Sequence, residues 1–153
     1  LTSVARECLA GADILIGESV LLAQVGDFTA DTWDPEGELD LVVDRIANHP
    51  QQQIVLLASG DPLFYGMARY LCERLGKERF EVLPHVSSMQ MAFARIKESW
   101  DEAYLTNLAS QSVDMVAERI RTAEKVGIFT TEGSPPGAVA KACLDRKIDY
   151  FTT

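Results

Sequence analysis

Residues 53–66 read QIVLLASGDPLFYG, and this stretch decides the fold. Its first six residues form an apolar run with the length of a buried strand, and a helical pattern follows the loop Ser59-Gly60-Asp61-Pro62. A strand that is apolar on both sides is typical of a parallel sheet covered by helices on both faces. The loop would then lie beyond the carboxyl end of its strand, where open α/β sheets bind ligands.

Apolar runs and amphipathic helical patterns alternate on both sides of this stretch. The pattern predicts further strands at residues 13–17, 80–83, 103–108, 125–130 and 148–151. It predicts helices at residues 36–48, 63–75, 87–97, 112–123 and 136–146. We therefore predict an α/β fold with a parallel-sheet N-terminal domain, residues 1–101, and the start of a second α/β domain, residues 102–153.

We expect this sequence to be truncated at both ends and to form part of a larger protein. A parallel α/β sheet usually begins with a strand that feeds its first helix, whereas Leu1 already lies in a helical pattern. At the other end, Thr153 lies in or just after a strand that has no visible partner.

The composition excludes several classes of protein. The chain has 153 residues, of which 47% are hydrophobic, with a net charge of −9, so binding to nucleic acid or to an anionic membrane is not expected. No apolar run approaches the roughly 18 residues of a membrane span. The three cysteines are far apart and the histidines number two, which argues against disulfides and a metal site and favours the cytoplasm.

The loop after residues 53–58 is the first candidate binding motif. Gly60 would let the backbone approach a ligand closely, and Asp61 could accept hydrogen bonds from a ligand hydroxyl or amine. Pro62 would fix the loop at or near the first turn of the next helix. The alternative interpretation is an Asp-Pro turn that only starts a helix.

The second candidate motif is residues 84–88, PHVSS, which also join a predicted strand to a helix. Ser87 and Ser88 could offer hydroxyls and helix-start amides to a ligand carboxylate or ribose. They could equally cap the helix, and both roles can hold together. Two such loops at the carboxyl ends of strands in one sheet would share a crevice.

The glycine patterns of the common dinucleotide and phosphate loops are missing, as is the GxSxG turn of serine hydrolases. Together with neighbouring segments, the two candidate motifs instead resemble the tetrapyrrole methylase family. The resemblance rests on residues 59–66 (SGDPLFYG), 82–88 (VLPHVSS), 90–95 (QMAFAR), 100–103 (WDEA) and 125–130 (KVGIFT). It is nearest to the precorrin-6Y and cobalt-precorrin-7 branch, which methylates C5 of a corrin precursor in cobalamin biosynthesis.

The resemblance implies that S-adenosylmethionine binds in a cleft between two α/β domains, with a corrinoid precursor over the mouth. The cofactor contacts that it implies are Gly60, Asp61, Pro62, Phe64, Ser87, Ser88 and Thr130. Family members are commonly homodimers, so it also implies a homodimer. Methyl transfer needs proximity and alignment rather than a metal or a thiolate, and no catalytic residue is assigned. Asp101 is a candidate base, with a structural role as the alternative.

Three departures from the family pattern stand out. The Gly-x-Gly-Pro-Gly loop that normally opens the fold does not precede Leu1, His85 replaces a glycine, and residues 107–110 (NLAS) replace a His-Gly pair. The acidic chain would also need a local basic rim, including Arg69 or Arg95, to bind a carboxylate-rich corrinoid. Two alternatives therefore stay open: a sister tetrapyrrole methylase acting at another ring position, and a non-catalytic α/β module that binds a ligand or a partner. A decarboxylating methyltransferase domain is sometimes fused downstream in this branch.

Overall fold

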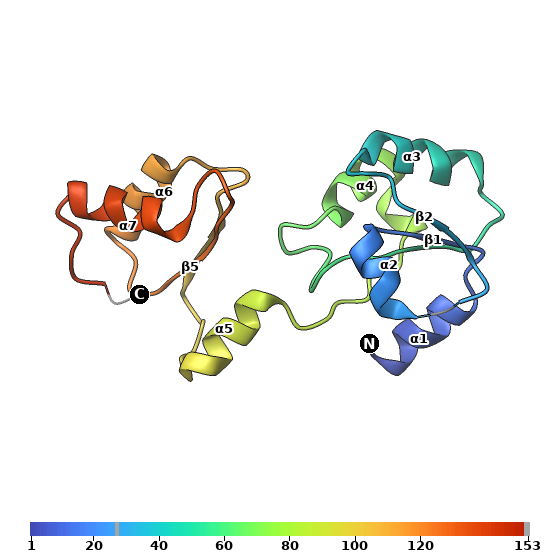
Figure 1. The fold of residues 1–153 in the computed structure, drawn as a ribbon, viewed down its shortest axis with the longest axis horizontal. Coiled ribbons are helices and arrows are strands. Elements are labelled where there is room, and N and C mark those ends of the chain that lie inside the picture. Colours follow the sequence, from blue (N-terminus) through green and yellow to red (C-terminus); the bar gives the residue numbers. More distant parts are fainter. Residues whose placement is uncertain (27, 152–153) are drawn as a thin grey trace. The chain divides into compact units, whose positions relative to one another are not determined.

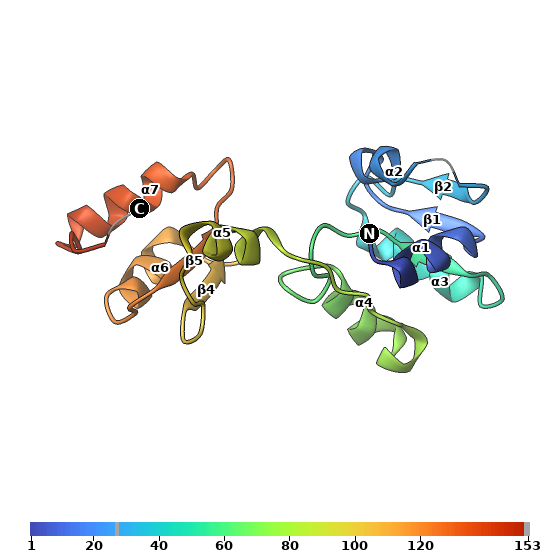
Figure 2. The same cartoon turned by 90° about the horizontal axis from the view of Figure 1, so that it is seen from below.

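The computed structural model describes residues 1–26 and 28–151, and the chain forms two compact units, Leu1–Ser87 and Ser88–Thr153. Each unit is a parallel sheet with helices on both faces (Figures 1 and 2). The first contains α1 (Ser3–Ala10), β1 (Ile14–Ile16), α2 (Ser19–Val25), β2 (Asp31–Trp33), α3 (Leu39–Asn48), β3 (Ile54–Leu56), α4 (Ala68–Leu75) and the 3-10 turn η1 (Lys77–Arg79). The second contains α5 (Ser88–Ile96), β4 (Tyr104–Asn107), α6 (Val113–Ile120), β5 (Val126–Phe129) and α7 (Pro136–Asp145).

The sheet of the first unit has the order β2-β1-β3, and both pairings are parallel. Ile14 pairs with Asp31 on one side and with Ile54 on the other. Each of the three residues of β1 is 1% exposed, since the strand has neighbours on both edges and helices on both faces. Strand β1 is therefore the centre of this unit.

Side-chain alternation along β1 divides the first unit into two cores. Leu15 points to the face covered by α1 and α2, where it packs with Leu9 and Leu57. Ile14 and Ile16 point to the opposite face, which α3 and α4 cover. On that face they pack with the fully buried Val42 and Leu71, so the sheet carries a separate apolar core on each side.

A carboxylate that follows β2 binds the first residue of α2, the helix that follows β1. Asp34, directly after β2, accepts hydrogen bonds from the backbone N–H and the hydroxyl of Ser19, at 2.7 and 2.6 Å. These bonds, led by the Ser19 hydroxyl, hold the pKa of the Asp34 carboxyl below its ordinary value. Helix α2 and strand β2 lie in a part of the chain for which the sequence predicted no element.

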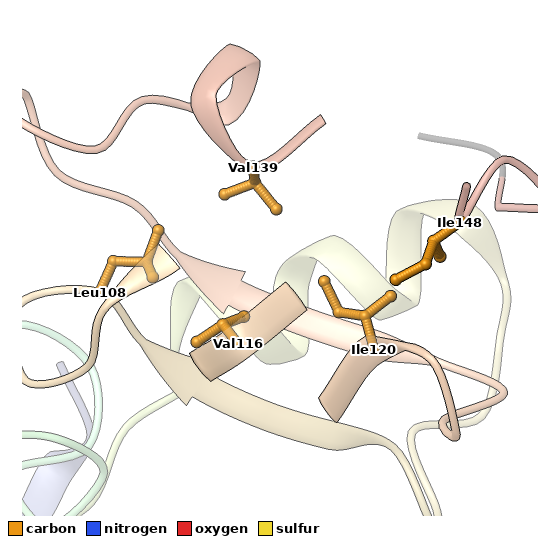
Figure 3. Packing of buried hydrophobic residues seen from close by; sticks show 5 residues of the cluster. All are labelled: Leu108, Val116, Ile120, Val139 and Ile148. Atoms are coloured by element: carbon orange, nitrogen blue, oxygen red, sulfur yellow. The ribbon is translucent and has the colours of Figure 1, made fainter. Parts of the chain in front are cut away.

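The second unit is built on the parallel pair β4 and β5. Helices α6 and α7 cover one face of this pair and α5 lies on the other (Figures 1 and 2). Figure 3 shows the core under α6 and α7, where Val116 and Ile120 from α6 meet Val139 from α7. On the opposite face, a Cβ added to Gly127 would lie 2.4 Å from the sulfur of Met89, so α5 packs directly on the β5 backbone.

The structure confirms the α/β fold and corrects three of the predicted elements. Residues 80–83 form no strand, because they pair with no neighbouring strand in the described chain, although the backbone of Phe80 is extended. The last predicted strand, residues 148–151, is also absent over these residues, and Ile148 instead fills the core beneath α6. Helix α4 begins at Ala68 rather than at residue 63. Helix α5 belongs to the second unit, and the boundary after residue 101 stays a prediction for the domains of the whole protein.

Thr106 provides a test of the core of the second unit. Its side chain is fully buried in β4, and its hydroxyl oxygen has no hydrogen-bond partner in the described part of the chain. Because valine has the same shape without the polar group, Thr106→Val should raise the free energy of unfolding by about 1 kcal/mol. Urea unfolding measures the change. The exposed control Thr122→Val should alter stability by less than about 0.5 kcal/mol, and a destabilised Thr106→Val protein would show that the hydroxyl is satisfied.

Candidate ligand site

The two sequence motifs meet at the carboxyl end of β3. The backbone N–H of His85 donates a hydrogen bond to the carbonyl of Gly60 at 3.3 Å. A Cβ added to Gly60 would lie 3.1 Å from the Cα of Ser87, and Gly60 has a φ of +66°, in the left-handed region. Glycine is therefore required here both by the close approach of the second segment and by the backbone conformation.

Asp61 holds the first loop in shape through its own side chain. Its Oδ1 accepts a hydrogen bond from the N–H of Leu63 at 2.9 Å, and its carbonyl accepts one from Phe64 at 3.1 Å. The carboxylate is half-buried, and among the described residues its Oδ2 accepts no hydrogen bond. One oxygen therefore shapes the turn, while the other is available to a ligand.

Pro62 does not lie in the first turn of α4, in contrast to the sequence-based expectation. Tyr65 has a φ of +56°, which interrupts a helical path, and the carbonyl of Pro62 accepts the N–H of Ala68 at 3.2 Å. A Cβ on Gly66 would lie 2.3 Å from that same carbonyl oxygen. Residues 61–67 are thus a tight loop whose backbone caps the helix that follows.

Aromatic and aliphatic side chains surround this loop. Phe64 is half-buried and its ring contacts the ring of Tyr65 edge-on, with centroids 5.1 Å apart. Leu63 is 57% exposed, Tyr65 46% and Val86 52%, although all three lie within or next to the two motifs. The loops therefore present apolar surface beside the Asp61 carboxylate, a combination suited to a ligand with both a flat apolar part and hydroxyl groups.

The second motif contributes mainly through its backbone. Ser87 is buried beneath Gly60, with 6% of its surface exposed. The side chain of His85 is exposed, and the residue holds Gly60 through its backbone N–H alone. The replacement of glycine by histidine at position 85 is therefore compatible with the contact between the two loops. The sequence predicted that the two loops share a crevice, but not the backbone bond between His85 and Gly60 or the Pro62 cap, because backbone interactions leave no side-chain signal.

Ser88 and Thr130 belong to the second unit. Ser88 is the first residue of α5, and Thr130 is exposed directly after β5, at the carboxyl end of its sheet. In the β4 loop, the side chain of Asn107 accepts the N–H of Ala109 at 2.8 Å. This turn stands where the family resemblance would place a His-Gly pair. The roles of Ser88 and Thr130 toward a cofactor stay predictions.

The charged residues singled out from the sequence have local partners or are exposed. Arg69 forms an ion pair with Glu73 at 2.8 Å on the surface of α4. Arg95 is exposed in the last turn of α5. Asp101 accepts a hydrogen bond from the Ser99 hydroxyl at 2.9 Å, so it stabilises a turn.

Among residues 1–26 and 28–151, no three His, Cys, Asp or Glu side chains form a group that could hold a metal ion. Over the same residues, no helix is long and apolar enough to cross a membrane.

Solved structures of methyltransferases share this fold. The structure titled methyltransferase CobJ superimposes with a TM-score of 0.72 and 21% identity, covering 95% of this chain and 70% of that one. The cobalamin biosynthetic enzyme cobalt precorrin-4 methyltransferase, CbiF, gives a TM-score of 0.70 at 18% identity, with coverage of 97% and 70%. At these identities the similarity establishes the fold, which is that of the compared methyltransferases.

Sequence comparison defines the class more narrowly. The model of the Tetrapyrrole (Corrin/Porphyrin) Methylases matches residues 1–143, so the chain is a methyltransferase by class. It belongs to the tetrapyrrole methylase family, as the two motifs predicted.

Two curated relatives illustrate the similarity. Cobalt-precorrin-7 C(5)-methyltransferase of Salmonella typhimurium is 29% identical over 146 residues, which are 95% of this chain and 72% of that protein. Precorrin-6Y C(5,15)-methyltransferase [decarboxylating] of Mycobacterium tuberculosis is 30% identical over 142 residues, 92% of this chain and 35% of that protein.

The close approach of the loops predicts the effect of Gly60→Ala. The added methyl group would meet the Ser87 backbone, and alanine would be strained at this positive φ, so the free energy of unfolding should fall by about 1–3 kcal/mol. Chemical denaturation of the purified chain measures this. Gly11→Ala is the matched control, because Gly11 has a φ of −94° and the added Cβ would make only ordinary contacts. Equal stability of the two variants would contradict the proposed packing of the loops.

Proposed function

We propose that this chain is the S-adenosylmethionine-binding part of a methyltransferase that methylates C5 of a corrin-ring precursor in cobalamin biosynthesis. The observation that carries the proposal is the contact of Gly60 with the His85–Ser87 segment, which brings both family motifs to one sheet edge. Membership of the tetrapyrrole methylase family supports the reaction class. The names of the two relatives support the C5 position.

The residues at this edge fit the chemistry of the cofactor. Asp61 has an available carboxylate oxygen for ribose hydroxyls, and the neighbouring Phe64 and Tyr65 rings offer apolar surface to an adenine ring. Gly60 carries no side chain, and its contact with Ser87 holds the backbone of this loop in place beside Asp61. The net charge of −9 also favours a cationic sulfonium compound over an anionic cofactor.

The bound cofactor would supply an electrophilic methyl group, and the protein would supply alignment. Methyl transfer to an electron-rich ring carbon is an in-line displacement, so holding the two reactants close and correctly oriented provides much of the acceleration. Asp61 and the backbone around Gly60 would fix the ribose end of the cofactor. Phe64 would pack beside it, and Ser87, Ser88 and Thr130 would complete its contacts. We assign no catalytic base.

The ring position that is methylated has one alternative to C5. A sister reaction at another ring position is favoured by one observation, the structural similarity to a cobalt precorrin-4 methyltransferase. That similarity has 18% identity, whereas the C5 enzymes are 29–30% identical, so we prefer C5. Arg95, which is exposed and makes no ion pair among the described residues, is the better candidate for a substrate carboxylate than the paired Arg69.

A homodimer and a cytoplasmic location stay predictions of the family resemblance and of the cysteine content. A non-catalytic module with the same fold stays the alternative from a different class of protein. This alternative predicts no binding of the cofactor or its product, which distinguishes it from the enzyme.

Asp61 allows the structural and the ligand-binding roles of one carboxylate to be separated. Asp61→Asn keeps an oxygen that can accept the Leu63 N–H, but loses the charge that would bind ribose hydroxyls. We expect Asp61→Asn to keep the stability of the chain while its affinity for S-adenosylhomocysteine falls about tenfold or more. Asp61→Ala should lose both, with a destabilisation of about 1 kcal/mol. Isothermal titration calorimetry and urea unfolding measure the two effects.

The exposed Asp44→Asn on α3 serves as the charge-matched control for these titrations. The same titration is made on the protein encoded by the complete reading frame. Absence of binding by that protein would refute the methyltransferase proposal and support the non-catalytic module. Unchanged affinity in Asp61→Asn would refute the role of the carboxylate.

The C5 assignment predicts which precursor gains a methyl group. Incubated with S-adenosylmethionine, the complete protein should methylate precorrin-6Y or cobalt-precorrin-7 once at C5, as seen by mass spectrometry and ¹³C NMR of the labelled methyl group. A precorrin-4 substrate tested in parallel should stay unmethylated. Methylation of the latter alone would assign the protein to a sister reaction.

A further inference from the structure

Tyr65 has a backbone conformation that aromatic residues rarely adopt. Its φ is +56°, in the left-handed region, where the Cβ atom of an L-residue crowds its own backbone. The other non-glycine residues of the described chain that share this region are all charged and exposed: Glu36, Lys97, Glu102 and Lys147. Strain at an aromatic residue within a candidate ligand loop points to a role for its side chain.

The turn around Tyr65 does not itself require a tyrosine. The carbonyl of Pro62 accepts the N–H of Ala68 at 3.2 Å, and a Cβ on Gly66 would overlap that carbonyl. These contacts fix the path of the backbone through residue 65. Because glycine adopts a positive φ without strain, a glycine at position 65 would follow the same path. What the tyrosine adds to this turn is its side chain.

The side chain of Tyr65 belongs to the exposed apolar surface of the candidate ligand site. It lies in the same loop as Asp61, and 46% of the surface of Tyr65 is exposed. Leu63 in this loop and Val86 in the second motif are exposed as well. Apolar surface beyond the carboxyl end of a parallel strand is suited to a ligand with a broad apolar face.

The rings of Phe64 and Tyr65 cannot both stack on one flat ligand. Their centroids are 5.1 Å apart and their planes are inclined by 64°, edge to face. A planar group that lies parallel to one ring is therefore steeply inclined to the other. Phe64 is half-buried and Tyr65 is exposed, so the pair is suited to two flat ligands, a narrow one at Phe64 and a wide one at Tyr65.

We infer that Tyr65 is a substrate-binding residue, whose ring packs on the corrin-ring precursor while Phe64 packs on the adenine of the cofactor. The inference rests on the proposed function, which brings two flat molecules to this edge of the sheet. The tyrosine hydroxyl adds a neutral hydrogen-bond donor for a carboxylate at the rim of the precursor. Tyr65 thereby determines how the precursor lies over the loop, and the strained backbone is the cost of presenting its ring.

Tyr65→Gly separates the turn from the contact with substrate. Glycine relieves the strain, so the urea midpoint of the complete protein should not fall. The KM for precorrin-6Y or cobalt-precorrin-7, whichever is methylated, should rise about tenfold or more, while kcat changes less than about threefold, because a binding contact is lost. The Kd of S-adenosylhomocysteine, measured by calorimetry, should change less than about twofold.

Three further variants make the result specific to the ring. Glu36→Gly is the matched control, since Glu36 is an exposed left-handed residue of the same unit, outside both motifs, and its KM should stay unchanged. Tyr65→Phe keeps the ring and should raise KM by about threefold or less, for the lost hydroxyl. Phe64→Leu should do the reverse of Tyr65→Gly, weakening S-adenosylhomocysteine with little effect on the KM for the precursor. If Tyr65→Gly fails to fold, Tyr65→Asn replaces it, because asparagine tolerates the left-handed region.

The outcomes separate this inference from the proposed function. An unchanged KM in the Tyr65 variants would show that the ring only fills the turn, and would overturn the inference. A Kd for S-adenosylhomocysteine that rises by the same factor as KM would assign Tyr65 to the cofactor and also overturn it. An equal rise of KM in Glu36→Gly would have the same consequence. If the complete protein without any substitution binds no S-adenosylhomocysteine, the proposed function itself fails, and the inference with it.

Discussion

The parallel pairing of β1 with both of its neighbours is the constraint on which the first unit depends. Ile14, Leu15 and Ile16 are buried on every side, and their alternation separates the core under α1 and α2 from the core under α3 and α4. A shift of one residue in this register would exchange the side chains of the two cores. The same register aligns the carboxyl end of β3 with that of β1, and this alignment determines where the Gly60 loop lies.

The sequence predicted the elements whose apolar pattern is long or bounded by clear signals. Strand β3, helix α3 and helix α7 follow from an apolar run, a helical stripe and a helix-starting proline. Strand β2 has only three residues, two of them exposed, so its pairing with β1 could not be read from its composition. Residues 80–83 show the opposite error, since a strand needs a partner as well as suitable residues.

The candidate site was predictable as a meeting of two loops but not in its internal geometry. Both loops follow apolar segments directed toward the same sheet edge, and in the structure Gly60 lies against Ser87. The sequence predicted that Asp61 faces a ligand, and the structure shows that its Oδ1 also accepts the N–H of Leu63 within the loop. Helix α4 begins at Ala68 and not near Pro62, because Tyr65 has a left-handed backbone conformation that interrupts a helix between these residues. Hydrogen bonds between a side chain and the nearby backbone compete with helix formation, and the periodicity of apolar residues does not reveal them.

The contact between His85 and Gly60 has a practical consequence for the study of this loop pair. Since the bond uses only the backbone N–H and the side chain is exposed, the position can accept a cysteine carrying a fluorescent or spin label. A reporter placed there would lie against the first loop without replacing any group that holds it. Residue 85 is therefore a natural attachment point for following events at the carboxyl edge of β3 in solution.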